Sequence, residues 1–166
     1  MAIIDGMLQE LEHEAQTTRR VLERVPADKL TWRPHPKART LGELAMHVAR
    51  VPGGVAELIG SPSPAQVPTF AEPVLNSASE LIPALDESIA KARKKLGSMD
   101  DGALTETWRM MQGEREILAL PRAALLRSIM LNHWYHHRGQ LSVYLKELDV
   151  PIPSIYGPSA DENPFG

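Results

Sequence analysis

Two histidines of this chain, His133 and His137, stand four residues apart in a segment whose apolar residues recur at helical spacing. On an α-helix such residues lie on one face with about 5–6 Å between their Cβ atoms, a reach that suits one metal ion. A third histidine, His47, lies on the apolar stripe of an earlier helical segment. We therefore predict that three imidazoles from two helices converge inside the protein.

Three buried imidazoles need partners for their ring nitrogens, and one divalent cation satisfies three of these nitrogens together. A three-histidine ligand set also leaves a coordination position for water or substrate, which is the arrangement of catalytic sites. The sequence thus predicts a metal site formed by His47, His133 and His137. A simpler interpretation stays open, because a single buried histidine is more often a hydrogen-bonded core residue than a ligand.

Three polar residues near these histidines are candidates for catalysis: Glu43, Gln140 and Tyr144. Glu43 lies one turn before His47 and could act as a base, although a helix-capping role explains it without chemistry. Gln140 and Tyr144 follow the histidine face, where they could line a pocket, orient water or pack in the core. His136 lies about 100° around the helix from its neighbour, so we expect it at the rim or the surface.

The elements that must carry these residues are helices, identified by apolar residues at spacings of three and four. They are expected from residue 3 to about 25, from residue 40, from residue 77 or 79 to about 96, and over about 121–148. Pro26 ends the first helix, and the sequence from Thr40 to Glu43 matches a capping box for the second. Pro52 predicts a kink in the second helix, and Pro121 has the signature of the first residue of the last helix.

The connections carry the prolines. Residues 60–77 contain four prolines and can only be a loop, of a length typical of functional lids or flexible segments. Residues 98–120 show no dominant period, and residues 150–166 form an irregular tail. With no convincing strand, we expect an all-α protein, a single domain over residues 1–166, built as a four-helix bundle with metal ligands on facing helices.

Composition narrows the possible functions. The 166-residue chain carries a formal net charge of −3 without an extended basic run, which argues against a nucleic-acid partner. It has no cysteine, so any thiol used in its chemistry must come from a cosubstrate. The start of the chain lacks the pattern of a signal peptide and no stretch suits a membrane span, so we expect a cytoplasmic protein without a membrane partner.

The motifs around the histidines resemble the DinB-like, or YfiT-like, superfamily of metal-dependent proteins. The resemblance lies in GELAMH at 42–47, the four-residue spacing of His133 and His137, and above all HHRGQL at 136–141. Further matches are LTWRP at 30–34, VPIP at 150–153 and YGPS at 156–159. The resemblance implies an up-up-down-down four-helix bundle that binds one divalent metal through positions matching His47, His133 and His137. The metal implied is zinc or nickel, and sometimes iron or manganese. Homodimers are common in this superfamily.

The resemblance also suggests reactions. Relatives with assigned activity include thiol S-transferases that use bacillithiol, mycothiol or glutathione, and a maleylpyruvate isomerase. We therefore expect an S-transferase that joins a low-molecular-weight thiol to a small electrophilic molecule. Two alternatives stay open: a hydrolase that uses metal-activated water, and a metal-stabilised stress-response binding module without turnover.

Overall fold

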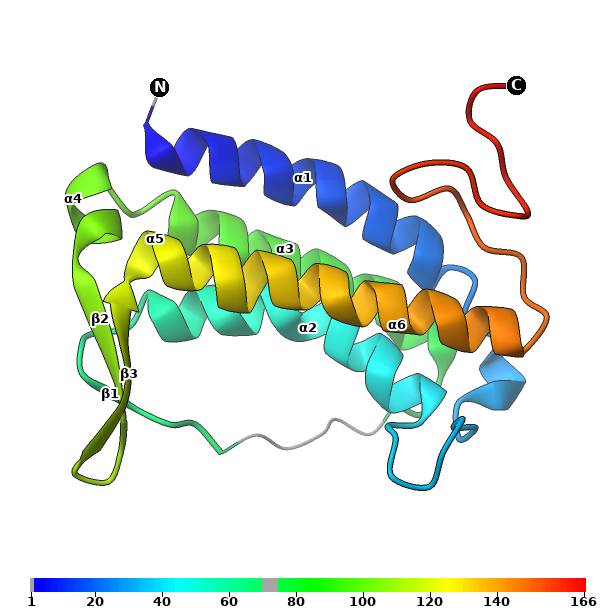
Figure 1. Ribbon diagram of the computed structural model, residues 1–166, viewed down its shortest axis with the longest axis horizontal. Coiled ribbons are helices and arrows are strands. Elements are labelled where there is room, and N and C mark those ends of the chain that lie inside the picture. The colour runs from blue at the N-terminus through cyan, green and yellow to red at the C-terminus, as the bar shows by residue number, and fades with distance from the viewer. Residues whose placement is uncertain (1, 70–74) are drawn as a thin grey trace.

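The computed structural model describes residues 2–69 and 75–166, and the fold is mostly helical (Figure 1). The long helical segments are α1 (Ile3–Leu22), α2 (Leu41–Ile59), α3 (Leu81–Leu96) and a last run of α5 (Arg122–Leu125), η3 (Leu126–Asn132) and α6 (His133–Glu147). The short helices are η1 (Ala27–Lys29), η2 (Ala78–Glu80) and α4 (Asp101–Thr105). Helix α2 packs against both α3 and α6, and α1 packs against α3 and α6. The up-up-down-down order of a bundle stays a prediction.

A small sheet makes the all-α prediction wrong. It consists of β1 (Ala65–Gln66), β2 (Thr107–Gln112) and β3 (Arg115–Pro121), in the order β1-β2-β3. Strands β2 and β3 form an antiparallel hairpin, and β1 pairs with β2 in parallel. The sheet lies at one end of the long helices (Figure 1).

The sequence analysis did not predict the β2–β3 hairpin, and there are two physical reasons. The register shifts between Met110 and Met111, and such a bulge breaks the alternation by which a strand is recognised. The apolar residues of strand β3, at 117–120, are also consecutive rather than alternating, so the strand lacks the period of two by which a half-buried strand is recognised. The turn itself depends on Gly113, whose φ of 62° favours glycine.

The predicted helix starts are largely confirmed. At Thr40 the hydroxyl accepts from the Glu43 amide at 3.2 Å, and the Glu43 carboxylate accepts from the Thr40 amide at 2.7 Å. Of the two starts predicted for the third helix, Ser77 is used as the cap of the short helix η2, and α3 follows from Leu81 with Glu80 as its N-cap, so no helix starts at Ser79. Pro121 was predicted as the first residue of the last helix. It is instead the last residue of β3 and the N-cap of α5, so the helix begins one residue later, at Arg122.

Boundaries elsewhere differ modestly from the predictions. Helix α1 ends at Leu22, a few residues before Pro26. The segment predicted as a loop over residues 60–77 contains strand β1, and its residues 70–74 lie outside the described residues. Residues 150–166 contain neither helix nor strand, as expected. Within the described parts of the chain, no helix combines the length and apolar character needed to cross a membrane.

Helix α2 continues through Pro52 and bends along its length (Figure 1). The amide of the next residue, Gly53, donates to the Ser88 hydroxyl of α3 at 2.8 Å. A Cβ atom on Gly53 would lie 2.7 Å from the Ser88 carbonyl oxygen, so only glycine allows the two helices to approach this closely. This contact fixes α2, which carries His47, against α3.

Candidate metal centre

The structure brings His47, His133 and His137 together, as the sequence analysis expects. One nitrogen from each ring lies within 4.8 Å of the others, and the Nε2 atoms of His47 and His133 are 3.1 Å apart. Two nitrogens bound to one tetrahedral zinc ion lie ~3.3 Å apart, given Zn–N bonds of ~2.0–2.1 Å. The nitrogen spacing therefore fits one divalent ion, with only small side-chain movements needed to bring the third ligand in.

A π-helical segment, η3, precedes the two histidines of the last helical run and ends directly before His133. Its i→i+5 hydrogen bonds widen the helix and rotate the residues that follow it relative to those before it, and such segments are frequent at functional sites. Met130 before His133 and Leu141 after it are both buried. The sequence analysis expected one uninterrupted helix here, because a π turn has no simple sequence signal.

Burial keeps two of the three imidazoles, those of His47 and His133, uncharged. It is the main cause that lowers the pKa of His47 to about 3, and the positive charge of Arg39 and the neighbouring histidines add to the effect. Burial likewise lowers the pKa of His133. Both rings are therefore neutral at pH 7, which is the form that offers a lone pair to a metal ion.

Gln140 orients His137. Its Oε1 atom lies 2.7 Å from Nδ1 of His137, one turn away on α6. A proton on Nδ1 donated to this oxygen leaves the Nε2 lone pair for a metal, which is the usual support of a histidine ligand. This contact gives Gln140, one of the predicted catalytic candidates, a positioning role.

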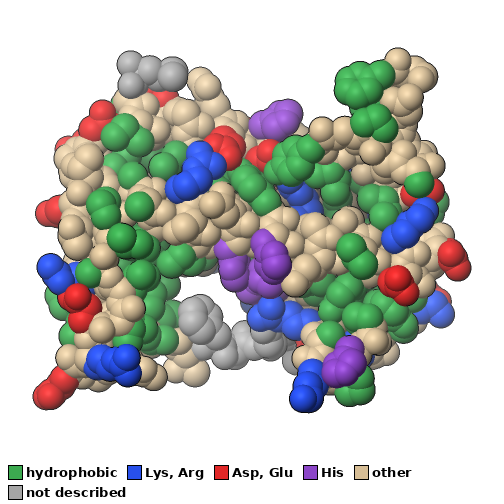
Figure 2. All heavy atoms as spheres, viewed as in Figure 1, with side chains coloured by type: hydrophobic (Ala, Val, Ile, Leu, Met, Phe, Trp, Pro, Cys, Tyr) green, Lys and Arg blue, Asp and Glu red, His purple; other side chains and the backbone are tan. Residues whose placement is uncertain are grey.

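An open cavity of about 470 Å³ adjoins one of the three histidines, His137, with Gln140 and Tyr144 also in its wall. The Tyr144 hydroxyl donates to the Arg39 carbonyl at 3.3 Å, and burial raises the pKa of this hydroxyl. In Figure 2, histidine side chains cluster at the surface in the middle of the face viewed, beside Lys and Arg side chains. The site can therefore admit a small molecule to the open side of a bound ion.

Two other predicted residues lie outside this arrangement. The Glu43 carboxylate accepts from the Thr40 amide, and this hydrogen bond is the main reason that the pKa of Glu43 is lowered. It does not line the cavity. His136 is exposed, with its ring centroid 5.0 Å from that of His137, and it is not one of the three clustered histidines.

Arg138, next to the candidate ligand His137, is a buried structural residue. The sequence left two positions open for it, a solvated one and a pairing role between helices, and the structure shows the pairing role. It is 1% exposed and forms an ion pair with Glu14 of α1 at 2.6 Å. Its guanidinium also donates to the Thr18 hydroxyl and to the Tyr156 hydroxyl. This network joins α6 to α1 and to the C-terminal segment directly behind the histidines.

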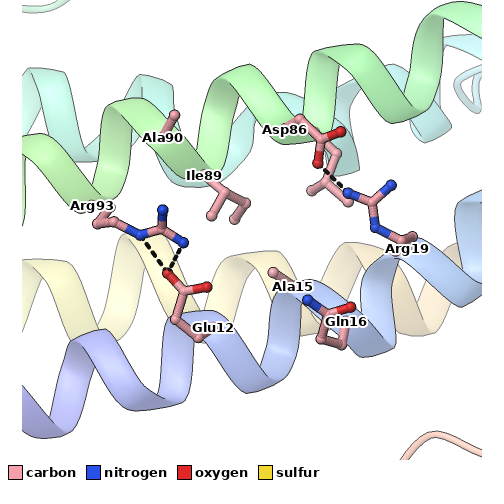
Figure 3. Close-up of a pocket in the computed structure, with 9 residues that line it drawn as sticks. Glu12, Ala15, Gln16, Arg19, Asp86, Ile89, Ala90 and Arg93 are labelled. Carbon is pink, nitrogen blue, oxygen red and sulfur yellow. Dashed lines mark hydrogen bonds and ion pairs between the residues drawn. The ribbon is translucent and has the colours of Figure 1, made fainter.

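A smaller cavity of about 170 Å³ lies between α1 and α3 (Figure 3). Its charged side chains pair across it, Arg19 with Asp86 and Arg93 with Glu12. The apolar side chains between the two pairs offer no group for catalysis. The chemistry of the described residues is thus concentrated at the three histidines.

Fold and site together define a helical protein with a small sheet and a three-histidine cluster that suits one divalent ion. A family model of the DinB family matches residues 3–163, so the chain belongs to the DinB family. The uncharacterized protein YrdA of Bacillus subtilis is 26% identical over 163 residues, which cover 96% of this chain and 91% of YrdA.

Two solved structures share the fold. A crystal structure of a DinB-like protein from Bacillus cereus superposes with a TM-score of 0.72 at 24% identity, over 92% of this chain and 97% of the other. The DinB-like protein YjoA of Bacillus subtilis gives a TM-score of 0.64 at 18% identity, over 87% of this chain and 92% of the other. At these identities the two structures support the fold alone.

Proposed function

We propose that this DinB family member is a metal-dependent enzyme that joins a low-molecular-weight thiol to a small electrophilic molecule. The observation that carries the proposal is the convergence of three imidazole nitrogens within 4.8 Å of one another beside an open cavity. A closed structural site fills all positions of its ion with protein ligands, whereas three ligands leave a position for a reactant. Zinc or nickel suits this all-nitrogen ligand set.

Each residue of the site has a defined part in this proposal. His47, His133 and His137 would hold the ion, which when bound would lower the pKa of a thiol that reaches its open side. Gln140 holds the His137 ring in place. The thiol proton passes to solvent and the sulfur forms a bond to an electrophilic carbon. An alkyl halide releases its halide with the bonding electron pair, whereas in an epoxide or an activated alkene that pair moves to the ring oxygen or the adjacent carbon, which then takes a proton from solvent. Because the chain has no cysteine, the thiol is a second substrate.

Hydrolysis by activated water is less well supported. That reaction needs a base at the open side of the ion. No carboxylate lies among the described residues that line the cavity, and the Glu43 carboxylate is engaged at the start of α2. A water on the ion would also lose its proton near pH 7, so the missing carboxylate counts only against hydrolysis steps that need a separate proton acceptor.

The test is thiol consumption by protein purified without a histidine tag. The protein is loaded with zinc or nickel and mixed with glutathione, bacillithiol or mycothiol and a panel of alkyl halides, epoxides and activated alkenes. We expect consumption that stops with a chelator, returns with metal, and is lost in His47→Ala but kept in His136→Ala. If no thiol and electrophile pair reacts in a metal-dependent way, the proposal is wrong.

A further inference from the structure

Tyr156 belongs to the irregular C-terminal segment, yet its hydroxyl reaches the buried ion pair behind the histidines. The Arg138 guanidinium donates to this hydroxyl at 2.6 Å, and the hydroxyl donates to the Glu14 carboxylate at 3.0 Å. The guanidinium carbon lies 5.2 Å from the centre of the Tyr156 ring. Tyr156 is 68% exposed, whereas Arg138 and Glu14 are 1% and 5% exposed. Tyr156 is therefore the outermost group of this network and lies between the ion pair and solvent.

The chain that follows Tyr156 is attached to the helices less firmly. We call residues 156–166 the C-terminal strap; all of it is described, and it contains neither helix nor strand. In Figure 1 the C-terminal segment runs from the end of α6 towards α1. Two acidic side chains of the strap form ion pairs with these helices, Glu162 with Arg20 of α1 and Asp161 with Lys146 of α6. Exposed ion pairs contribute little to stability, whereas hydrogen bonds to buried charged groups are stronger. Tyr156 is therefore the strongest of these attachments.

Helix α6 is held about its own axis from two sides. Arg138 directly follows His137, and adjacent residues of a helix point about 100° apart. Arg138 pairs with Glu14 of α1. His133 and His137 cluster instead with His47 of α2. A rotation of α6 that moves Arg138 away from α1 therefore also displaces the two histidine rings from His47.

We propose that Tyr156 is a positioning residue of the metal centre, and that docking of the C-terminal strap and binding of a metal ion stabilise each other. A docked Tyr156 holds Arg138, and with it the rotation of α6 that presents His133 and His137. A bound ion fixes the same rotation from the side of α2, so it favours docking of the strap. By thermodynamic linkage the two effects have the same size. This inference rests on the metal site of the proposed function and not on thiol transfer.

Tyr156→Phe tests the positioning role, because it keeps the ring and removes the hydroxyl. The zinc affinity of the full chain is measured by competition with a chelating dye, and we expect it to fall about fivefold, at the lower end of typical couplings between sites. The absorption bands of the cobalt(II) protein should also change, since they report the arrangement of the ligands. Lys146→Gln is the matched control. It breaks an exposed ion pair of the same strap without touching Arg138, and it should leave affinity and spectrum unchanged.

These readouts distinguish positioning from a purely structural role. A hydroxyl that only stabilises the fold would lower the free energy of unfolding of the metal-free protein in urea. It would leave the zinc affinity and the cobalt(II) spectrum of the folded protein as they are in the wild type. That result, or an equal loss of zinc affinity in Lys146→Gln, overturns the inference.

Hydrogen exchange measures the reverse effect and needs no substitution in the strap. The Ser159 amide donates to the Glu162 carbonyl at 2.8 Å, and the Glu162 amide donates to the Ser159 hydroxyl at 2.9 Å. These bonds should open when the strap leaves the helices, because one short turn does not offset its conformational entropy alone. We expect zinc to slow this exchange about fivefold in the wild type and not in His47→Ala. The exposed hairpin turn at residues 113–114 should exchange alike with and without zinc.

Strap exchange that zinc does not change overturns the inference. The outcome is also independent of catalysis. Coupling between the strap and zinc in a protein that consumes no thiol supports the inference and ends the proposed reaction. Metal-dependent thiol consumption by a protein whose strap and zinc affinity are uncoupled ends the inference alone.

Discussion

The indole Nε1 of Trp134 donates a 2.8 Å hydrogen bond to the backbone carbonyl of Val48. In a regular helix this carbonyl would accept from the amide of residue 52, but that residue is Pro52, which has none. Val48 follows His47 in the chain, and Trp134 follows His133. The bond therefore ties together the two helices that carry the three clustered histidines, and it satisfies a carbonyl that would otherwise be buried without a donor.

Trp134→Phe keeps an aromatic ring but removes this donor. We expect it to lower the free energy of unfolding by about 1–3 kcal/mol, because the Val48 carbonyl is left unsatisfied. We also expect weaker metal binding. Urea unfolding of the metal-free protein and titration with zinc measure the two effects.

Pro52→Ala provides the control, since it restores an amide to residue 52 that can bond to Val48. In the Pro52→Ala protein, Trp134→Phe should lower the free energy of unfolding by less than it does in the wild-type chain. Part of the loss remains, because the phenyl ring is smaller than the indole ring. If the two substitutions are simply additive in the free energy of unfolding, the proposed link between Pro52, Val48 and Trp134 is wrong.

Gln140→Ala should reduce metal affinity about 10- to 100-fold, because His137 loses the oxygen that fixes its ring. Gln140→Glu keeps an acceptor at this place and should retain tight binding. Gln140 is exposed, so the melting temperature of the metal-free protein should change little in either variant. Equal affinities of the alanine variant and the wild type would show that His137 is held by other contacts.

Substitution of Arg138 tests the buried network behind the site. Arg138→Met leaves Glu14, itself 5% exposed, without its cation, and we expect a loss of about 3–5 kcal/mol in the free energy of unfolding. The double variant Arg138→Met, Glu14→Leu removes both charges and should recover much of that loss. Chemical denaturation of the three proteins gives the comparison, and a double variant no better than Arg138→Met would count against a charge-based cause.

What could be predicted from the sequence was local. The capping box at Thr40 and Glu43 and the spacing of His133 and His137 are set within one or two turns of helix, where spacing determines geometry. The apolar stripe was enough to place His47 on the inward side of α2.

The features that the sequence analysis did not predict depend on residues far apart in the chain, or lie in segments whose apolar residues follow no regular period. Burial of Arg138 depends on Glu14 and Tyr156, which lie far away in the chain and show no pattern that links them. Lys37 lies in an irregular connection, where no period indicates that it will line a cavity. The hairpin was hidden by the register shift at Met110.

Acid should destabilise the metal-free protein through its histidines. The pKa of His47 is about 3 in the folded protein against about 6.5 in an unfolded chain, so between these values the unfolded state binds more protons. The free energy of unfolding therefore falls as the pH decreases from about 6.5 toward 3. His133, whose pKa is also lowered, acts in the same direction.

Urea unfolding at several pH values in the presence of a chelator measures this dependence. Carboxylates also contribute to it, so the comparison is with His47→Gln, which cannot be protonated in this range. We expect the variant to lose less stability than the wild type between pH 6.5 and pH 4.5. Parallel curves would show that His47 is readily protonated in the folded protein.

The central claim is that His47, His133 and His137 bind one metal ion. The direct measurement is elemental analysis of the untagged wild-type protein and of four alanine variants, at each of these histidines and at His136. We predict about one divalent ion per chain in the wild type and in His136→Ala, and none in the other three. A wild-type protein that holds no stoichiometric metal after incubation with zinc or nickel, or an equal loss in His136→Ala, would contradict the claim.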